Sequence, residues 1–274
     1  MLKDKIIFLD LDGTLLDHTY KLPESAREAL RLAKSNGHHL YINTGRSIGQ
    51  VNDYIWEVGF QGFIGGNGNY IKTEGKELFH RPIPQAIVVK VYDYLVKHEI
   101  GFFQEGQECL YAHPRYLDEL ASLLKITPNQ AQEKTDSIFP STAYNQIGWH
   151  EKVNKISVVL TDKVDVESLR KLIEPELALG FFNLFGNQRE FGDIYQEGTS
   201  KGKAVEFVMN YLDLPMSDSF CFGDSTNDIE MIKMAGTGVA MGNAIPKLKI
   251  VADLVTAPVN EDGLWKAFRQ IGLI

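Results

Sequence analysis

Two aspartates near the amino terminus have the types and the spacing that phosphoryl chemistry requires. Asp10 and Asp12 follow the short, nearly continuous apolar run 5–9 and precede a glycine. Side chains alternate along an extended chain, so residues two apart lie on the same side of it. One ionised carboxylate could attack phosphorus, while the other exchanges a proton with the leaving oxygen and then with water. A solvated turn explains an isolated Asp-x-Asp-Gly about equally well.

Two further segments carry groups that suit phosphate oxygens. Thr44, Gly45 and Arg46 offer a hydroxyl, exposed backbone N–H groups and a cation that could meet a substrate anion. Lys201 stands at the start of an expected helix, where its ammonium could offset charge on a transferring phosphoryl group. Each signal is weak alone, because a Thr-Gly pair is usually a turn and most lysines are solvated.

A fourth segment, residues 223–228, predicts a magnesium site. Asp224 follows the strand-like run 219–222, and Asn227 and Asp228 come three and four residues later, on one side of a helical turn. Mg²⁺ takes oxygen ligands and usually only one or two carboxylates, which Asp10 and Asp224 would supply. A dication between them would also remove the repulsion that raises the pKa of one of two neighbouring carboxylates. A solvated Asn/Asp loop is the alternative.

The elements around these segments predict a doubly wound α/β fold with a parallel sheet. Apolar runs alternate with amphipathic helical patterns at both ends of the chain, as in parallel strands joined by helical crossovers. Ligands bind outside the carboxyl ends of such strands, which is where the polar segments fall. The expected strands are 5–9, 39–42, 62–64, 219–222 and 238–241, and the expected helices are 23–36, 51–56, 201–211 and a short one reaching 231.

The middle of the chain has a different character. Strand-like runs alternate with helical stretches there, and no motif has catalytic spacing. The runs are 101–104, 155–160 and 179–185, and the helical stretches are 85–97, 114–124 and 164–173. We therefore expect a discontinuous α/β catalytic core, residues 1–82 plus 190–274, and an inserted α+β cap, residues 83–189, that sets substrate specificity.

Together these motifs resemble those of the haloacid dehalogenase superfamily of phosphohydrolases. The likeness is to its Cof-type branch, which has a Rossmann-like core and a cap inserted after the third core strand. Asn67-Gly68 and the segments 238–244 and 260–263 also resemble this branch. The resemblance implies that Asp10 is the nucleophile and a Mg²⁺ ligand. It makes Asp12 the general acid/base, with its backbone carbonyl offered to the metal.

The same resemblance implies roles for the other motif residues. Asp224 would complete the protein ligands of Mg²⁺, and Asp228 would orient Lys201 or a metal-bound water. The expected substrate-binding residues are Thr44, Gly45, Arg46, Lys201 and Asn227, with Thr44 and Lys201 holding the phosphoryl group. The substrate would be a small phosphorylated metabolite such as a sugar phosphate, a nucleotide or a phosphorylated cofactor. The cap diverges most within the branch, so it leaves the substrate's identity open.

Composition limits the partners and the location. The 274-residue chain has a formal net charge of −8 at pH 7, which gives no electrostatic reason to approach nucleic acid or an anionic membrane. No apolar run approaches the roughly 20 residues that span a bilayer. Cys109 and Cys221 lie far apart in apolar surroundings, as expected of reduced thiols. We expect a cytoplasmic protein that binds a small phosphate ester; the sequence leaves open whether it is a monomer or a small homo-oligomer.

Two other functions fit part of the pattern. A phosphate-accepting regulatory protein of the receiver type would also place an acidic cluster and a lysine at such a sheet edge, but it needs neither Asp12 nor a large specificity domain. A phosphotransferase or sugar phosphomutase would use the same aspartyl-phosphate while excluding water. The products distinguish hydrolysis from phosphoryl transfer, since hydrolysis releases inorganic phosphate and transfer yields an isomerised sugar phosphate.

Overall fold

The computed structural model describes residues 5–182 and 190–274. The chain divides into two compact units. The first contains the residues up to Arg46, Asn52–His80 and Thr199–Ile274, and the second contains Ser47–Val51 and Arg81–Gly198. Compactness alone assigns no task to either unit, so the division of labour between a catalytic core and a cap stays a prediction.

The first unit is built on an eight-stranded sheet in the order β14-β13-β12-β1-β2-β3-β4-β5. Its first six strands in this order are parallel, and five of them match the expected strands. The edge strand β14 and the antiparallel hairpin formed by the last two strands were not predicted. The parallel strands are β1 (Ile6–Leu9), β2 (His39–Asn43), β3 (Gly62–Gly65), β12 (Ser219–Gly223), β13 (Thr237–Ala240) and β14 (Leu254–Val255). The hairpin strands are β4 (Tyr70–Thr73) and β5 (Lys76–His80).

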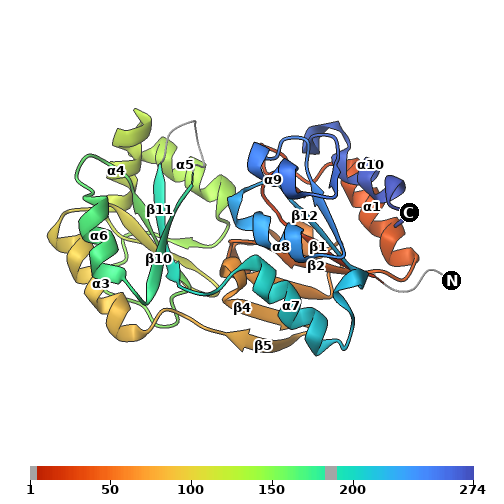
Figure 1. Ribbon diagram of the computed structural model, residues 1–274. Helices are drawn as coiled ribbons and strands as arrows, with labels where there is room; N and C mark the ends of the chain where they lie inside the picture. The colour runs from red at the N-terminus through yellow and green to blue at the C-terminus, as the bar shows by residue number, and fades with distance from the viewer. Residues whose placement is uncertain (1–4, 183–189) are drawn as a thin grey trace. The chain divides into compact units, whose positions relative to one another are not determined.

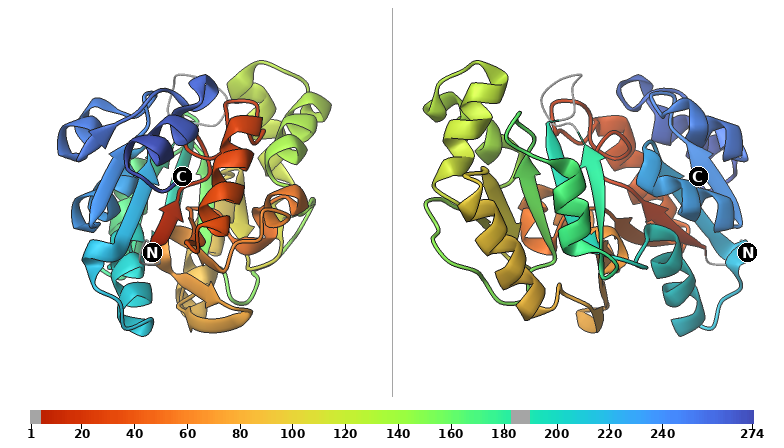
Figure 2. Two further views of the ribbon diagram at one scale, coloured as in Figure 1. Left: turned by 90° about the vertical axis from the view of Figure 1, so that its right-hand side faces the viewer. Right: turned by 60° about the vertical axis from the view of Figure 1, so that its left-hand side comes forward.

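Helices cover both faces of this sheet (Figures 1 and 2). On one face lie α1 (Glu24–Ser35) and α10 (Gly263–Gln270), and on the other lie α7 (Lys201–Tyr211), α8 (Ile229–Met234) and α9 (Pro246–Val251). Every residue of β1 is buried, which explains why that strand reads as a continuous apolar run rather than an alternating one. This arrangement confirms the doubly wound α/β fold class.

Local sequence explains where the first helix begins and ends. α1 starts directly after Pro23, whose fixed φ suits a helix start, and it stops before Gly37, which has a φ of 92°. The expected helix 51–56 is shorter than predicted: α2 covers Asp53–Trp56, and the 3₁₀ turn Ile48–Gln50 precedes it. The reason is the backbone of Val51 and Asn52, which is extended and separates the two turns.

The second unit is an α+β unit with a six-stranded sheet in the order β10-β11-β9-β6-β7-β8. The strands are β6 (Phe102–Glu105), β7 (Leu110–Ala112), β8 (Thr142–Ala143), β9 (Lys155–Val159), β10 (Leu177–Phe182) and β11 (Phe191–Gln196). The helices are α3 (Gln85–Lys97), α4 (Arg115–Leu124), α5 (Pro128–Ile138) and α6 (Val166–Ile173). The expected strand 179–185 begins earlier, at Leu177, and its last three positions, 183–185, lie outside the described residues.

Four elements of this unit, β7, β8, α5 and β11, were not predicted, and the last two show why. Helix α5 is mostly polar and buries only three side chains, so its periodicity is faint, and it begins instead with a capping box between Thr127 and Gln130. Strand β11 contains a glycine and Asp193, which have low strand propensity. Its pairing with β10 on one side and β9 on the other overrides that preference.

A buried ionic network lies within the second unit. The ammonium of Lys155 is 3.3 Å from Glu105 Oε2 and 3.1 Å from Asp193 Oδ2. The Ser157 hydroxyl also donates to Asp193. Because buried charges are costly unless they are paired, this network fixes three neighbouring strands, β6, β9 and β11, relative to one another.

The segment Ser47–Val51 belongs to this unit through specific hydrogen bonds. The Ser47 amide donates to Glu105 Oε1 at 2.6 Å, and the Asn154 side chain donates to the Ser47 hydroxyl at 2.8 Å. Two more bonds, from Gly49 N to the Gln107 carbonyl (3.0 Å) and from the Gln50 side chain to the Ser141 carbonyl (2.9 Å), complete the attachment. These contacts join a segment that precedes the inserted region to the strands and loops of that region.

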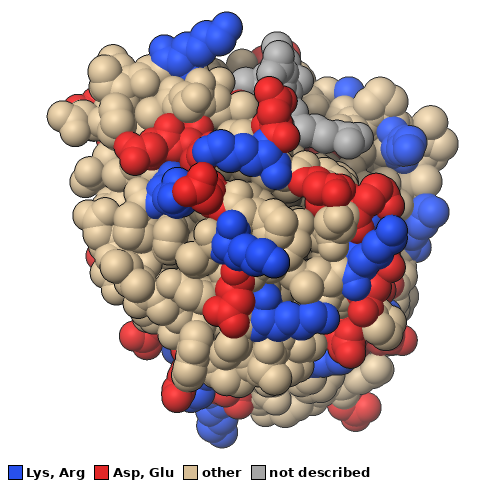
Figure 3. All heavy atoms as spheres, turned by 90° about the vertical axis from the view of Figure 1, so that its left-hand side faces the viewer, with Lys and Arg blue, Asp and Glu red and all other residues tan. Residues whose placement is uncertain are grey.

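The surface over the outer helices of the second unit carries both signs of charge. On the face shown in Figure 3, lysine and arginine side chains alternate with aspartate and glutamate among the described residues. This mixture is typical of a solvated surface rather than of a basic footprint for nucleic acid. None of the helices in the described part of the chain is long and apolar enough to cross a membrane.

Candidate active site

The predicted site segments meet at one edge of the first unit's sheet. Asp10 follows β1, Thr44 follows β2 and Asp224 follows β12, and these three strands are neighbours in the order β12-β1-β2. Parallel neighbouring strands carry their carboxyl ends to the same edge. Lys201 is the first residue of α7, which follows the Ser200 N-cap. Segments far apart in the chain therefore converge here because of the topology.

The Lys201 ammonium joins two of the carboxylates. Its Nζ donates to Asp10 Oδ1 at 2.5 Å and to Asp228 Oδ1 at 2.6 Å, and its side chain is only 1% exposed. Burial alone would lower the pKa of Lys201, but the charges of Asp10 and Asp228 outweigh burial and raise this pKa above its usual value. The lysine is therefore a fixed cation at neutral pH.

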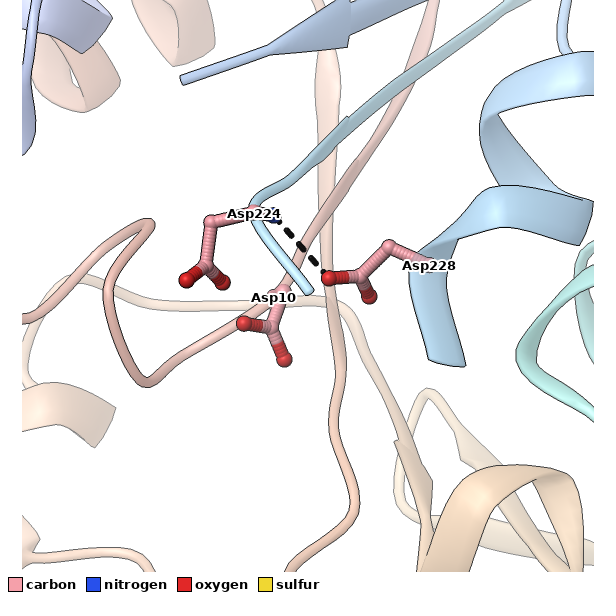
Figure 4. Close-up of side chains that lie close together, drawn as sticks. All are labelled: Asp10, Asp224 and Asp228. Atoms are coloured by element: carbon pink, nitrogen blue, oxygen red, sulfur yellow. Dashed lines mark hydrogen bonds between the residues drawn. The ribbon is translucent and has the colours of Figure 1, made fainter. Parts of the chain in front are cut away.

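Three carboxylates crowd together beside this cation. Asp10, Asp224 and Asp228 each offer an oxygen within 4.8 Å of the others (Figure 4). Burial, followed by the charge of Asp228, raises the pKa of Asp224 to about 7. Burial also raises the pKa of Asp10 well above its usual value; Lys201 opposes this shift, and the Asp228 and Asp224 charges add to it. Such mutual repulsion is what a bound cation would relieve.

The contacts of Asp228 show which of these carboxylates could hold a metal ion. Its Oδ1 accepts from Lys201, and its Oδ2 accepts from the backbone amides of Asp224 (3.0 Å) and Ser225 (2.9 Å). Both of its oxygens are therefore already used in bracing the site. That leaves Asp10 and Asp224 as the pair of carboxylates whose oxygen chemistry fits Mg²⁺.

Gly13 makes room for the Asp224 carboxylate. A Cβ atom added at Gly13 would lie 2.5 Å from Asp224 Oδ2, which is closer than real Cβ contacts allow. Its φ of 83° is also in the left-handed region that favours glycine. The glycine of Asp-x-Asp-Gly therefore serves both the turn after Asp12 and the close approach of a carboxylate from another strand.

Asp12 lies apart from the carboxylate cluster and has its own partner. Arg46 donates to both of its oxygens, from Nε at 2.8 Å and from Nη2 at 2.5 Å. The guanidinium carbon of Arg46 also lies 5.5 Å from the centroid of the Tyr20 ring, in a cation–π contact. The Asp12 side chain is 42% exposed. Arg46 was expected to bind substrate, and its pairing with the Asp12 motif was not predicted.

Thr44 and Asn227 lie at the same rim, together with Asn67, for which no role was predicted from the sequence. The Thr44 hydroxyl accepts from the Arg46 amide at 3.1 Å, which turns its own hydrogen elsewhere. The Asn227 side chain donates to Asn67 Oδ1 at 2.8 Å. An Asn-Gly pair two residues after the end of the third strand was the available signal for Asn67.

Known proteins are similar in sequence to this chain over nearly its whole length. A family model described as haloacid dehalogenase-like hydrolase matches residues 7–268. The chain belongs to this family. It is 32% identical to the "Putative phosphatase YkrA" of Bacillus subtilis, with 98% of each chain covered. It is 30% identical to the pyridoxal phosphate phosphatase YbhA of Escherichia coli, over 95% of this chain and 96% of that one.

A solved structure agrees with this membership. A hypothetical protein from Geobacillus kaustophilus superimposes with a TM-score of 0.79 at 28% identity, covering 99% of this chain and 100% of that one. The resemblance to Cof-type members of the family, inferred from the motifs, is thereby confirmed, and so is the prediction of an enzyme. The chain is a phosphoric monoester hydrolase of the haloacid dehalogenase-like family, acting on small phosphorylated substrates.

Proposed function

We propose that this family member hydrolyses small phosphorylated metabolites with Mg²⁺, through an aspartyl-phosphate formed on Asp10. The observation that carries the proposal is the shared position of the Asp10 carboxylate. One of its oxygens accepts from the buried Lys201 ammonium, while the side chain also belongs to a carboxylate cluster of the kind that holds a divalent cation. A nucleophile, a fixed cation and metal ligands are thereby within reach of one phosphoryl group.

In the first step, an oxygen of Asp10 forms a bond to phosphorus as the bond from phosphorus to the leaving oxygen breaks. Asp12 gives a proton to that leaving oxygen. In the second step, Asp12 takes a proton from a water molecule that attacks phosphorus, which releases inorganic phosphate and regenerates Asp10. Arg46 orients Asp12 for its role as base in the second step, because its two hydrogen bonds fix the plane of the ionised carboxylate. In the first step, a protonated Asp12 would give up one of these two bonds, since its proton occupies one oxygen.

The other site residues bind and brace. The Thr44 hydroxyl and the Lys201 ammonium would hold phosphoryl oxygens, together with the backbone of Gly45. Asp10 and Asp224 would hold Mg²⁺ with the backbone carbonyl of Asp12, and the bound ion would supply positive charge against the transferring phosphoryl group. Asp228 would keep Lys201 and the loop after β12 in place, as its bonds to both already indicate.

Removal of metal is expected to suppress activity, and Mg²⁺ is expected to restore it. The stabilisation of the folded protein by Mg²⁺ should also depend on pH, because Asp224 with a pKa of about 7 must lose a proton to bind a cation. Without metal, this raised pKa means that the folded state keeps a proton that the unfolded state releases, so this group's contribution to stability falls as the pH rises from about 4 to 7. The Mg²⁺-induced rise in Tm should therefore be larger at pH 8 than at pH 6.

Calorimetry of the EDTA-treated protein with and without added Mg²⁺ measures this. Asp224→Asn is the matched variant, since it removes one ligand charge without changing volume. It should lose both the Mg²⁺-induced rise in Tm and its pH dependence. Full activity in metal-free buffer, or an equal rise in Tm in that variant, would contradict the metal assignment.

The substrate is proposed at the level of chemical class. A relative named as a pyridoxal phosphate phosphatase supports phosphorylated cofactors as candidates beside sugar phosphates and nucleotides. We assign specificity to the second unit, as a cap, because it lacks the motifs described above. Screening a panel of metabolite phosphates for released phosphate tests this. Conversion of a sugar phosphate into its isomer, without free phosphate, would favour phosphoryl transfer instead.

The cytoplasmic location and the oligomeric state stay predictions. The free thiols of Cys109 and Cys221 are consistent with that location.

A further inference from the structure

Asn67 has an unusual backbone and a close neighbour in the phosphate-binding turn. It follows β3 with φ 56° and ψ 40°, a left-handed conformation that asparagine tolerates better than most residues. Its backbone amide donates to the Thr44 carbonyl at 3.1 Å. A Cβ atom added at Gly45 would lie 3.2 Å from Asn67 Oδ1 and 3.6 Å from Asn67 Nδ2. The side-chain amide of Asn67 therefore lies directly against the Thr44–Gly45 turn.

The hydrogen bonds around Asn227 fix the direction of both side-chain amides. Asn67 Oδ1 accepts from Asn227 Nδ2 at 2.8 Å, and Asn227 Oδ1 accepts from the Ser225 hydroxyl at 2.5 Å. Each amide oxygen is thus used within the protein. Each NH₂ group has two hydrogens to donate, of which the Asn67–Asn227 bond uses one. Within the described part of the chain, no acceptor is bonded to Asn67 Nδ2.

This arrangement leaves N–H donors at a rim where an anion is expected, while each amide oxygen already accepts one bond within the protein. We propose that Asn67 is a substrate-binding residue that donates from Nδ2 to a phosphoryl oxygen and, through its Oδ1, positions Asn227 to do the same. The inference rests on the proposed function, and it adds Asn67 to a phosphate-binding set that the motifs had limited to Thr44, Gly45, Arg46, Lys201 and Asn227. The two asparagines, 160 residues apart in the sequence, would act as one pair of neutral donors.

Two substitutions of Asn67 distinguish substrate binding from a merely structural role. Asn67→Asp keeps the volume, the tolerance of left-handed backbone and an acceptor for Asn227, but it replaces the donor with an oxygen. Asn67→Gly keeps the backbone and removes the side chain. A structural role makes the aspartate variant the milder one. Our proposal predicts the reverse order, because a carboxylate at this position repels the phosphate dianion.

We expect Asn67→Gly to lower kcat/KM by about 10- to 100-fold, the effect of one charge-assisted hydrogen bond, and Asn67→Asp to lower it by roughly tenfold more. Competitive inhibition by inorganic phosphate should weaken in the same order. In a double-mutant cycle, Asn67→Gly and Asn227→Ala should lose less together than the product of their separate losses, because each acts through the other. The Mg²⁺-induced rise in Tm should persist in Asn67→Gly, since the metal ligands are intact.

Asn210→Asp, at an exposed position on α7, is the control for added negative charge and should leave kcat/KM within about twofold of the wild type. If Asn67→Asp is as active as the wild type, or more active than Asn67→Gly, the inference is wrong. Should the aspartate variant fail to fold, phosphate inhibition of Asn67→Gly decides alone, and an unchanged inhibition constant overturns the inference. Failure of the proposed function is a separate result: Asp10→Asn would then keep its activity, whatever the Asn67 variants do.

Discussion

Asp10→Asn is expected to lose roughly 10⁴-fold or more of its phosphatase turnover while keeping its fold. The amide has the same shape as the carboxylate but lacks the negative charge that makes a carboxylate oxygen nucleophilic toward phosphorus. Lys201 stays paired, because Asp228 also accepts from its ammonium at 2.6 Å. Initial rates with p-nitrophenyl phosphate and with the best substrate from the metabolite panel, at saturating Mg²⁺, measure the loss.

The stability of this variant is the second half of the test. Burial and the neighbouring charges of Asp228 and Asp224 both raise the pKa of Asp10, so the ionised form is disfavoured in the folded protein. Neutralising it should leave Tm in metal-free buffer unchanged or higher. Asp93→Asn, at an exposed position on α3, is the matched control and should keep both activity and Tm. Near-normal turnover in Asp10→Asn would disprove its role as nucleophile.

Lys201→Met has the other large expected effect, because it affects activity and stability together. The side chain is 1% exposed, and it supplies the positive charge beside Asp10, Asp224 and Asp228. Methionine fills a similar volume without that charge. Breaking a buried ion pair from one side typically costs about 3–5 kcal/mol, which urea unfolding in EDTA should show. Turnover should also fall steeply, since the cation that offsets phosphoryl charge is lost.

A double variant separates charge from packing in this prediction. Asp10→Asn combined with Lys201→Met removes one negative charge together with the positive one, so it should regain part of the lost stability but no activity. Lys203→Met, at an exposed position on the same helix, controls for the loss of a lysine. If Lys201→Met unfolds at the wild-type urea concentration, the ion pairs at this site contribute little to stability. If it also keeps its turnover, the proposed phosphoryl contact is wrong.

The convergence of the predicted site could be inferred because it depends on chain order and strand direction. Asp10, Thr44 and Asp224 each follow an apolar run that precedes a helical pattern, and parallel strands must then present them at one edge. The helical pattern of residues 201–211 placed Lys201 at the start of a helix, where the structure has it. Burial of the sheet on both faces made these runs conspicuous. The fold class and the family motifs were therefore legible in the residues alone.

The hydrogen-bonded pairs of polar side chains could not be predicted in this way. Arg46 meets Asp12 across 34 residues, and Asn227 meets Asn67 across 160 residues. Periodicity predicts which face of an element is buried, but it does not predict which polar groups bond to each other at its ends. The Asn67 contact also requires a left-handed backbone at a single position. The Asn-Gly pair is a signal for that turn, but it does not indicate that Asn227 is the partner.

The course of the chain has a consequence for engineering specificity by exchange of parts between relatives. The second unit is assembled from two pieces, Ser47–Val51 and Arg81–Gly198, so it is not one continuous insertion. A chimaera that swaps only the long piece would deprive Glu105 and Asn154 of their native hydrogen-bond partner, Ser47, inside the transplanted module. A transplant should therefore carry the short piece as well, even though it immediately follows Arg46 of the recipient's first unit.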